Sequence, residues 1–315
     1  MMKTPRSSNS LTRRDALSSL AATTLCAAVS PSPAAAAQER RFRYSLNTAT
    51  IMGQKLSVTE EVRIAGEAGY DGIEPWIRNI DAFTQGGGKL EELKRRIADR
   101  GLALPSAIGF MPWVVDDPDR RKQGLEEAKR CFDIVARLGG VRLAAPPTGA
   151  TDVSGLSIAV MAERYRALLD LGDTFGVTPE LEVWGFSKTL NRLGDAAAVV
   201  IESQHPRACV LADVYHLRKG GSGFEGVRVL SAESMPVFHV NDYPADIPPE
   251  KLADANRVYP GDGQAPLKTV FGMLRRIGFN GYLSLELFNR EYWMQDPLEV
   301  ARTGLRKMRA VAEAE

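Results

Sequence analysis

Short apolar runs alternate along the chain with longer segments in which apolar residues recur every three or four positions. The short runs are typical of buried β-strands, and the longer segments are typical of amphipathic helices. Strands are predicted over residues 44–47, 72–76, 102–106, 141–145, 178–183, 208–213, 237–240 and 282–288. Helices are predicted over residues 59–68, 90–100, 120–138, 158–175, 195–203, 224–230, 267–277 and 297–311.

Eight strand–helix units in one chain predict an α/β fold, the (β/α)8 TIM barrel, which typically takes about 250 residues. A doubly wound parallel sheet is the alternative. Such a sheet more often carries a glycine-rich phosphate loop after its first strand, and residues 44–54 contain none. No linker interrupts residues 38–315, so we expect them to form a single domain. In a barrel, chemistry belongs at the carboxyl ends of the strands.

Residues 1–37 differ from the rest of the chain. The pair Arg13-Arg14 precedes an alanine-rich run from Ala16 to Val29, and residues 34–37 are four alanines that offer a cleavage site. This order resembles a bacterial twin-arginine export signal. The apolar run is shorter than the roughly 20 residues that span a bilayer, so no membrane anchor is expected after processing. We therefore predict a periplasmic or secreted protein.

Composition and charge narrow the classes of function. The 315 residues include 40 basic and 39 acidic ones, for a formal net charge of +1, and 44% of the residues are hydrophobic. This is a globular composition without the basic surplus that nucleic-acid binding needs. Three cysteines in a chain of this length are too few for a disulfide scaffold.

Four consecutive predicted strands carry polar side chains of compatible chemistry near their carboxyl ends. They are Glu182, Asp213, His239 and Glu286. Neighbouring strand ends lie side by side in a barrel, so inward-pointing side chains there would converge. Three carboxylates and one imidazole suit Mn²⁺, Mg²⁺ or Co²⁺, with Zn²⁺ and Fe²⁺ also compatible. The sequence predicts one divalent metal ion, with Mn²⁺ favoured.

Glu180 competes with Glu182 for the metal site. Strand side chains alternate with a period of two residues, so these two glutamates share a face and alternation does not choose between them. Glu182 is favoured because it lies nearer the end of its strand.

Two histidines outside the ligand set receive different interpretations. His216 follows Asp213 by three residues and would stand over the same pocket, where it could hydrogen-bond a substrate oxygen. His205 precedes Pro206 in a turn at the opposite end of the barrel and is predicted to be structural.

The tryptophans all lie at or just after predicted strands. They are Trp76, Trp113, Trp184 and Trp293. Aromatic walls with a few polar groups suit the C–H faces of a carbohydrate ring. This placement favours a sugar or polyol as the small-molecule ligand, with the first three tryptophans as substrate-binding residues.

Several segments resemble the sugar isomerase and epimerase family of xylose-isomerase-like barrels. They are Glu182-Val183-Trp184-Gly185, Asp213-Val214-Tyr215-His216, His239-Val240-Asn241-Asp242, residues 254–263 and residues 284–293. The resemblance covers essentially all of residues 38–315, including residues 69–74.

The resemblance implies roles for individual residues. In that family one divalent metal is held by Glu, Asp, His and Glu on successive strands, which matches the four residues already singled out. Glu182 and Glu286 would also be the catalytic acid/base pair. His216 and Arg257 would contact the substrate, and Glu74 falls at a common family position grouped with the substrate-binding residues.

The implied reaction is isomerisation or epimerisation of a sugar or keto-polyol. A metal that chelates a carbonyl oxygen and the neighbouring hydroxyl would stabilise an enediolate while one glutamate removes a proton and the other returns it. Loss of a β-hydroxyl in the same site would instead make the protein a dehydratase. The export signal disfavours a phosphorylated substrate made in the cytoplasm.

Two alternatives belong to other classes. A non-catalytic periplasmic sugar-binding barrel would not need two acid/base glutamates. A multi-zinc endonuclease would need more than the three histidines present. A homo-oligomer is compatible with the sequence.

Overall fold

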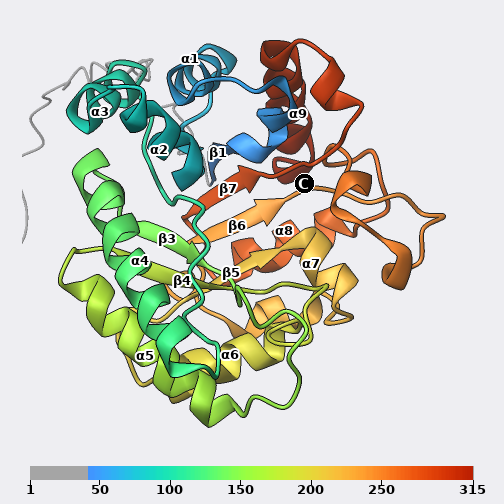
Figure 1. Cartoon of the computed structure of the whole chain (residues 1–315). Helices are drawn as coiled ribbons and strands as arrows, with labels where there is room; N and C mark the ends of the chain where they lie inside the picture. Colours follow the sequence, from blue (N-terminus) through green and yellow to red (C-terminus); the bar gives the residue numbers. More distant parts are fainter. Residues whose placement is uncertain (1–41, 315) are drawn as a thin grey trace, which may run out of the picture. The chain divides into compact units, whose positions relative to one another are not determined.

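The computed structural model describes residues 42–314, which belong to one compact unit; the predicted export signal lies outside the described residues. One parallel sheet runs through this unit in the order β2-β1-β7-β6-β5-β4-β3. Its strands are β1 Arg43–Asn47, β2 Gly72–Glu74, β3 Arg142–Ala145, β4 Thr178–Glu182, β5 Val210–Asp213, β6 Val237–Val240 and β7 Tyr282–Leu285. The pairing of β1 with β7 joins the two ends of the described chain (Figure 1).

Helices alternate with the strands and lie around the sheet (Figure 1). The α-helices are α1 Val58–Ala68, α2 Ile77–Gln85, α3 Leu90–Asp99, α4 Pro118–Leu138, α5 Ile158–Asp173, α6 Leu193–Glu202, α7 Val214–Lys219, α8 Leu267–Arg276 and α9 Pro297–Ala312. The 3-10 turns are η2 Thr48–Gln54, η3 Glu225–Val229, η4 Pro249–Lys251, η5 Asp254–Asn256 and η6 Tyr292–Met294. Among the described helices, none is long and apolar enough to cross a bilayer.

Residues 102–106 are predicted to form a strand, but in the structure they form irregular chain. This segment still bridges the sheet edges, because a β2 amide donates to the Ala103 carbonyl and a β3 amide donates to the Ala107 carbonyl, both at 2.9 Å. Pro105 stands between them and has no N–H, so a continuous ladder cannot form. The (β/α)8 prediction is confirmed, with an eighth position that meets the β2 side through isolated bridges and β3 through the hydrogen bonds of Ala107.

The helix prediction needs smaller corrections. The segment predicted as a helix over 224–230 is the short 3-10 turn η3. The sequence prediction also missed α2, which begins three residues after β2, and α7, a six-residue helix that begins directly at the end of β5.

Alternation along each strand separates two regions of packing. On β4, Leu181 belongs to the large core between the sheet and the helices, whereas Glu180 and Glu182 share the opposite face. A smaller apolar cluster lies within the barrel and includes Trp76, Ile108, Ala144, Leu211 and Val237. The interior is therefore apolar in part, and its polar positions are concentrated on particular strands.

We expect the outer core to carry much of the stability. Phe132 on α4 is fully buried, and Phe132→Ala should lower the free energy of unfolding by about 3–5 kcal/mol through lost burial and a cavity. Urea denaturation measures this change. The control Ile201→Ala, at a position that is 70% exposed, should shift stability by no more than about 0.5 kcal/mol. Equal effects of the two substitutions would contradict this assignment of the core.

Candidate active site

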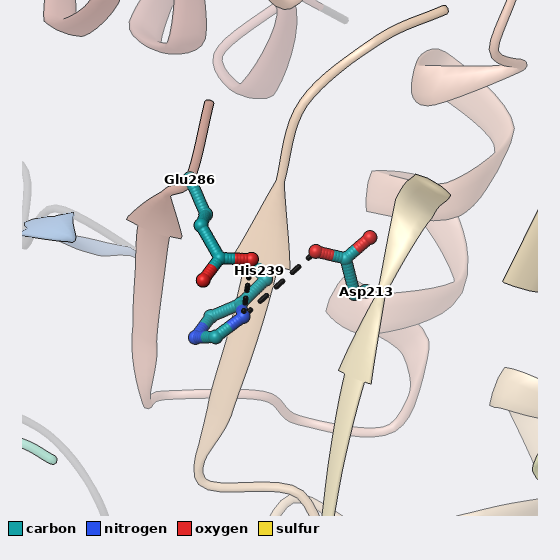
Figure 2. A group of neighbouring side chains, drawn as sticks. All are labelled: Asp213, His239 and Glu286. Atoms are coloured by element: carbon teal, nitrogen blue, oxygen red, sulfur yellow. Dashed lines mark ion pairs between the residues drawn. The ribbon is translucent and has the colours of Figure 1, made fainter. Parts of the chain in front are cut away.

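Asp213, His239 and Glu286 meet at the carboxyl ends of three adjacent strands. Asp213 ends β5, His239 lies in β6, and Glu286 directly follows β7; all three are buried. Their potential ligand atoms lie within 4.8 Å of one another. His239 Nδ1 is 3.2 Å from Glu286 Oε2 and 3.8 Å from Asp213 Oδ2, as Figure 2 shows. Two carboxylates and an imidazole in this arrangement could hold a divalent cation.

Local structure explains how Asp213 is held. Its Oδ1 accepts the backbone N–H of His216 at 2.9 Å, which makes Asp213 the N-cap of α7. Asn241 Nδ2 donates to its Oδ2 at 3.0 Å. Arg257 Nη1 also donates to Oδ2, so three residues orient the carboxylate before any ligand binds.

Glu182 and Glu180 are both buried on the inward face of β4, but their charged neighbours differ. Burial and the nearby charge of Glu286 raise the pKa of Glu182 to about 8. Glu180 instead lies 3.8 Å from Arg142 Nε, and neither of its oxygens has a hydrogen-bond partner. Glu182 thus lies beside Asp213, His239 and Glu286, but it is not part of the compact group that these three residues form.

The two predicted acid/base residues differ in proton affinity. Burial alone would raise the pKa of Glu286, but His239 and Arg257 outweigh it and lower that pKa to about 2. In the metal-free protein the surroundings thus favour a proton on Glu182 and a negative charge on Glu286.

Glu74 lies at the other ring nitrogen of His239. Glu74 Oε2 is 2.9 Å from His239 Nε2 and also accepts from Asn47 Nδ2 at 2.9 Å and Ser284 Oγ at 2.8 Å. A carboxylate at Nε2 holds the proton there and directs Nδ1 toward Asp213 and Glu286. Glu74 therefore orients His239, a candidate metal ligand. The sequence analysis instead grouped Glu74 with the substrate-binding residues.

Arg257 reaches the site from the chain after β6 and is almost fully buried. Its Nη1 is 2.7 Å from Glu286 Oε2 and 2.9 Å from Asp213 Oδ2. Its Nη2 is 2.7 Å from Asp254 Oδ1. The guanidinium thus compensates part of the negative charge of the candidate metal ligands.

His216 lies beside Arg257, the other residue to which the family resemblance gives a substrate-binding role. Burial lowers the pKa of His216 to about 3, with Arg257 acting in the same direction, so the ring is neutral. The Gly185 N–H lies 3.2 Å from Nδ1, and Arg257 Nη2 lies 3.3 Å from Nε2. Both neighbours are donors, so they compete for the one acceptor nitrogen of the neutral ring.

The tryptophans divide between the site and the core. The Trp76 N–H donates to Asn47 Oδ1 at 3.1 Å, and Asn47 Nδ2 donates to Glu286 Oε1 at 3.0 Å. Trp184 is half-buried and contacts rings on the same side of the barrel. Trp113 is fully buried, its N–H donates to the Pro146 carbonyl, and it belongs to the outer core. The expectation that Trp113 walls a pocket is therefore corrected, because the chain after residue 108 carries it beneath the surface.

Sequence reasoning missed three amide and hydroxyl side chains in this network. They are Asn47, Asn241 and Ser284. Each lies on or just after a strand that also borders the site, so the strand-end criterion used for the acids could have found them. His205 lies in the turn between α6 and β5, where the sequence places a structural histidine, and its Nε2 is 3.3 Å from Asp173 Oδ2.

Comparisons with known proteins place the chain in a family. A sequence profile described as xylose isomerase-like TIM barrel matches residues 62–311, and the chain belongs to that family. Inosose isomerase of Bacillus licheniformis is 26% identical over 277 residues, which cover 83% of this chain and 95% of the relative. The 3-dehydro-D-guloside 4-epimerase of Escherichia coli is 24% identical over 274 residues, with coverage of 80% and 94%.

A solved structure supports the fold independently. The crystal structure of the IolI protein with a bound zinc atom superposes with a TM-score of 0.80 at 20% identity, covering 86% of this chain and 98% of that one. The family resemblance and the barrel predicted from the sequence are both confirmed.

We expect Glu74→Gln to weaken metal binding by about 10- to 100-fold, because the amide cannot hold the proton on His239 Nε2 as a carboxylate does. Isothermal titration of the metal-free protein with Mn²⁺ measures the affinity. Glu180→Gln is the matched control, since this glutamate is also buried within the barrel but makes no hydrogen bond. Unchanged Mn²⁺ affinity in Glu74→Gln would remove its orienting role.

Proposed function

We propose that this protein is a metal-dependent enzyme that isomerises or epimerises a sugar or keto-polyol. The observation that carries the proposal is the buried group of Asp213, His239 and Glu286 at the carboxyl edge of a barrel of this family. The activities named for the two relatives, an inosose isomerase and a 3-dehydro-D-guloside 4-epimerase, support the same reaction class.

The donor set fits a divalent metal ion. His239 Nδ1 is buried and makes no hydrogen bond of acceptable geometry, as expected of an atom reserved for a cation. Asp213 and Glu286 contribute carboxylate oxygens, and we propose Glu182 as the fourth ligand. Its pKa of about 8 in the absence of the ion means that metal binding would release its proton. The oxygen-rich set favours Mn²⁺ as the physiological ion.

The chain's own residues would divide the remaining work. A bound divalent ion supplies a Lewis acid that polarises the substrate carbonyl. Glu286, whose Oε2 accepts from Arg257 Nη1 at 2.7 Å, would remove the proton from the carbon beside that carbonyl. Glu182, at the end of β4, exchanges a proton with the substrate. His216 and Arg257, whose Nε2 and Nη2 atoms are 3.3 Å apart, would contact the substrate.

The position to which the proton returns decides the product. Return to the adjacent carbon gives an isomer, and return to the opposite face gives an epimer. Departure of a β-hydroxyl instead gives a dehydrated product, which the same experiment detects.

Glu286→Gln should lower the rate of proton exchange by about 10²- to 10⁴-fold, because the amide cannot act as a base. The measurement is NMR of inososes and keto-sugars incubated in D₂O with Mn²⁺-loaded protein, which reports deuterium uptake, epimers and loss of water together. Glu299→Gln on the exposed surface of α9 is the control. Full exchange in Glu286→Gln refutes its role, and binding without exchange in the unaltered protein would indicate a sugar-binding barrel.

We also propose that residues 1–37 export the protein to the periplasm or beyond. Replacing Arg13 and Arg14 together with lysine should hold the protein in the cytoplasm, because the twin-arginine signal is read as a pair. Cell fractionation followed by immunoblotting measures the exported share. Arg6→Lys, outside the pair, serves as the control. Undiminished export of the double variant would rule out this route.

A further inference from the structure

Two phenylalanine side chains stand exposed among the residues that follow strand ends. Phe110 comes after the closing segment at 103–108, and Phe186 comes after β4. Phe110 is 40% exposed and Phe186 is 44% exposed. Among residues 42–314 they are the only aromatic members of the set of large exposed hydrophobic side chains; the others are Val141, Val153, Ile201, Val229 and Met294.

Ring contacts join these phenylalanines to the candidate active site. Phe110 and Phe186 both contact Trp184, with ring centroids 6.0 Å and 5.0 Å away. Phe110 also contacts Trp76 at 5.1 Å, and Phe186 contacts His216 at 5.6 Å. We call Trp76, Phe110, Trp184 and Phe186 the aromatic rim. It begins beside Asn47 and His216, which border the metal ligands, and it ends in the two exposed rings.

The inner members of the aromatic rim have little surface left for a ligand. Trp76 is 7% exposed, and the Arg78 guanidinium lies 4.2 Å from its ring centroid. Phe288 packs against Trp76 from another side, at 6.1 Å. Trp184 has a phenylalanine neighbour on each side. The apolar surface open to solvent therefore belongs mainly to Phe110 and Phe186.

The inner part of the aromatic rim lies beside the buried candidate metal ligands, and its outer part lies at the surface. Asp213, His239 and Glu286 are at most 4% exposed, so the reacting carbon of a substrate would be enclosed. Phe110 and Phe186 lie outside this buried group and remain 40% and 44% exposed. Exposed aromatic surface continuous with a site indicates a binding surface rather than scattered apolar residues.

We propose that the substrate is a glycoside. Its keto-sugar unit enters the metal site, and a second ring with an apolar face stacks on Phe110 and Phe186. The second ring is a sugar or an aromatic aglycone, since both present the C–H or π surface that aromatic side chains bind. This inference rests on the proposed function, and it makes Phe110 and Phe186 specificity-determining residues.

The test compares two probes that differ only in the second ring. Methyl β-D-glucopyranoside and phenyl β-D-glucopyranoside carry no ketone and remain unreacted, so isothermal titration of the Mn²⁺-loaded protein gives their affinities directly. We expect the phenyl glycoside to bind about tenfold more tightly, which is the scale of one or two aromatic contacts. In the double variant Phe110→Ala/Phe186→Ala the affinity ratio should fall to about one.

Matched variants keep the test independent of folding. Ile201→Ala removes an exposed apolar side chain from α6 and should leave the ratio at about ten. Phe110→Leu and Phe186→Leu retain apolar volume without a ring and should each lower the ratio by about two- to threefold. Circular dichroism and thermal unfolding of every variant identify any loss of structure, and the leucine variants decide the result if the double alanine variant unfolds.

Several results would overturn the inference. Equal affinity for the two probes, absence of binding by both, or an unchanged ratio in the double variant would each do so. A changed oligomeric state with an unchanged ratio would assign the phenylalanines to a subunit interface. Proton exchange with single keto-sugars is scored separately, so exchange without a preference for the phenyl probe leaves the proposed function standing and removes the glycoside. A preference without exchange removes the catalytic proposal instead.

Discussion

Burial of negative charge is the constraint on which the interior of this barrel depends. Glu74, Glu182, Asp213 and Glu286 are all buried within reach of the same imidazole or its neighbours. Unpaired buried carboxylates are costly, and the described residues offer only His239 and Arg257 as direct compensation at this point. A divalent cation would supply the missing positive charge, which is why the same residues are poorly explained as a structural ion-pair cluster.

The polar network around His239 also unites distant parts of the chain. One carboxylate oxygen of Glu74 on β2 accepts hydrogen bonds from Asn47 on β1 and Ser284 on β7. The same oxygen contacts the His239 ring on β6. Because these strands pair in a fixed register, small movements of any one of them would be resisted by several hydrogen bonds. Such support from rigid strands is what a candidate ligand set needs if its geometry is to persist through a reaction.

The site changes character from its interior to its opening. The inner residues are charged, buried and mutually hydrogen-bonded, which suits the discrimination of a carbonyl and hydroxyl groups. The outer residues are aromatic and partly exposed, and they lie on loops that follow the strands. Loops tolerate sequence change better than the strands that carry the ligands. Reaction chemistry and substrate choice can therefore vary separately in this barrel.

The sequence by itself determined the class of fold, because periods of two and of three to four residues are local properties of strands and helices. It also placed Asp213, His239 and Glu286 at strand ends, and parallel pairing was enough to bring them together. Only the tertiary structure decided that residues 103–108 still close the barrel, that Trp113 belongs to the core while Phe110 is exposed, and that Glu74 orients His239. These outcomes depend on loop paths, strand register and side-chain packing across segments far apart in the chain, which no local periodicity encodes.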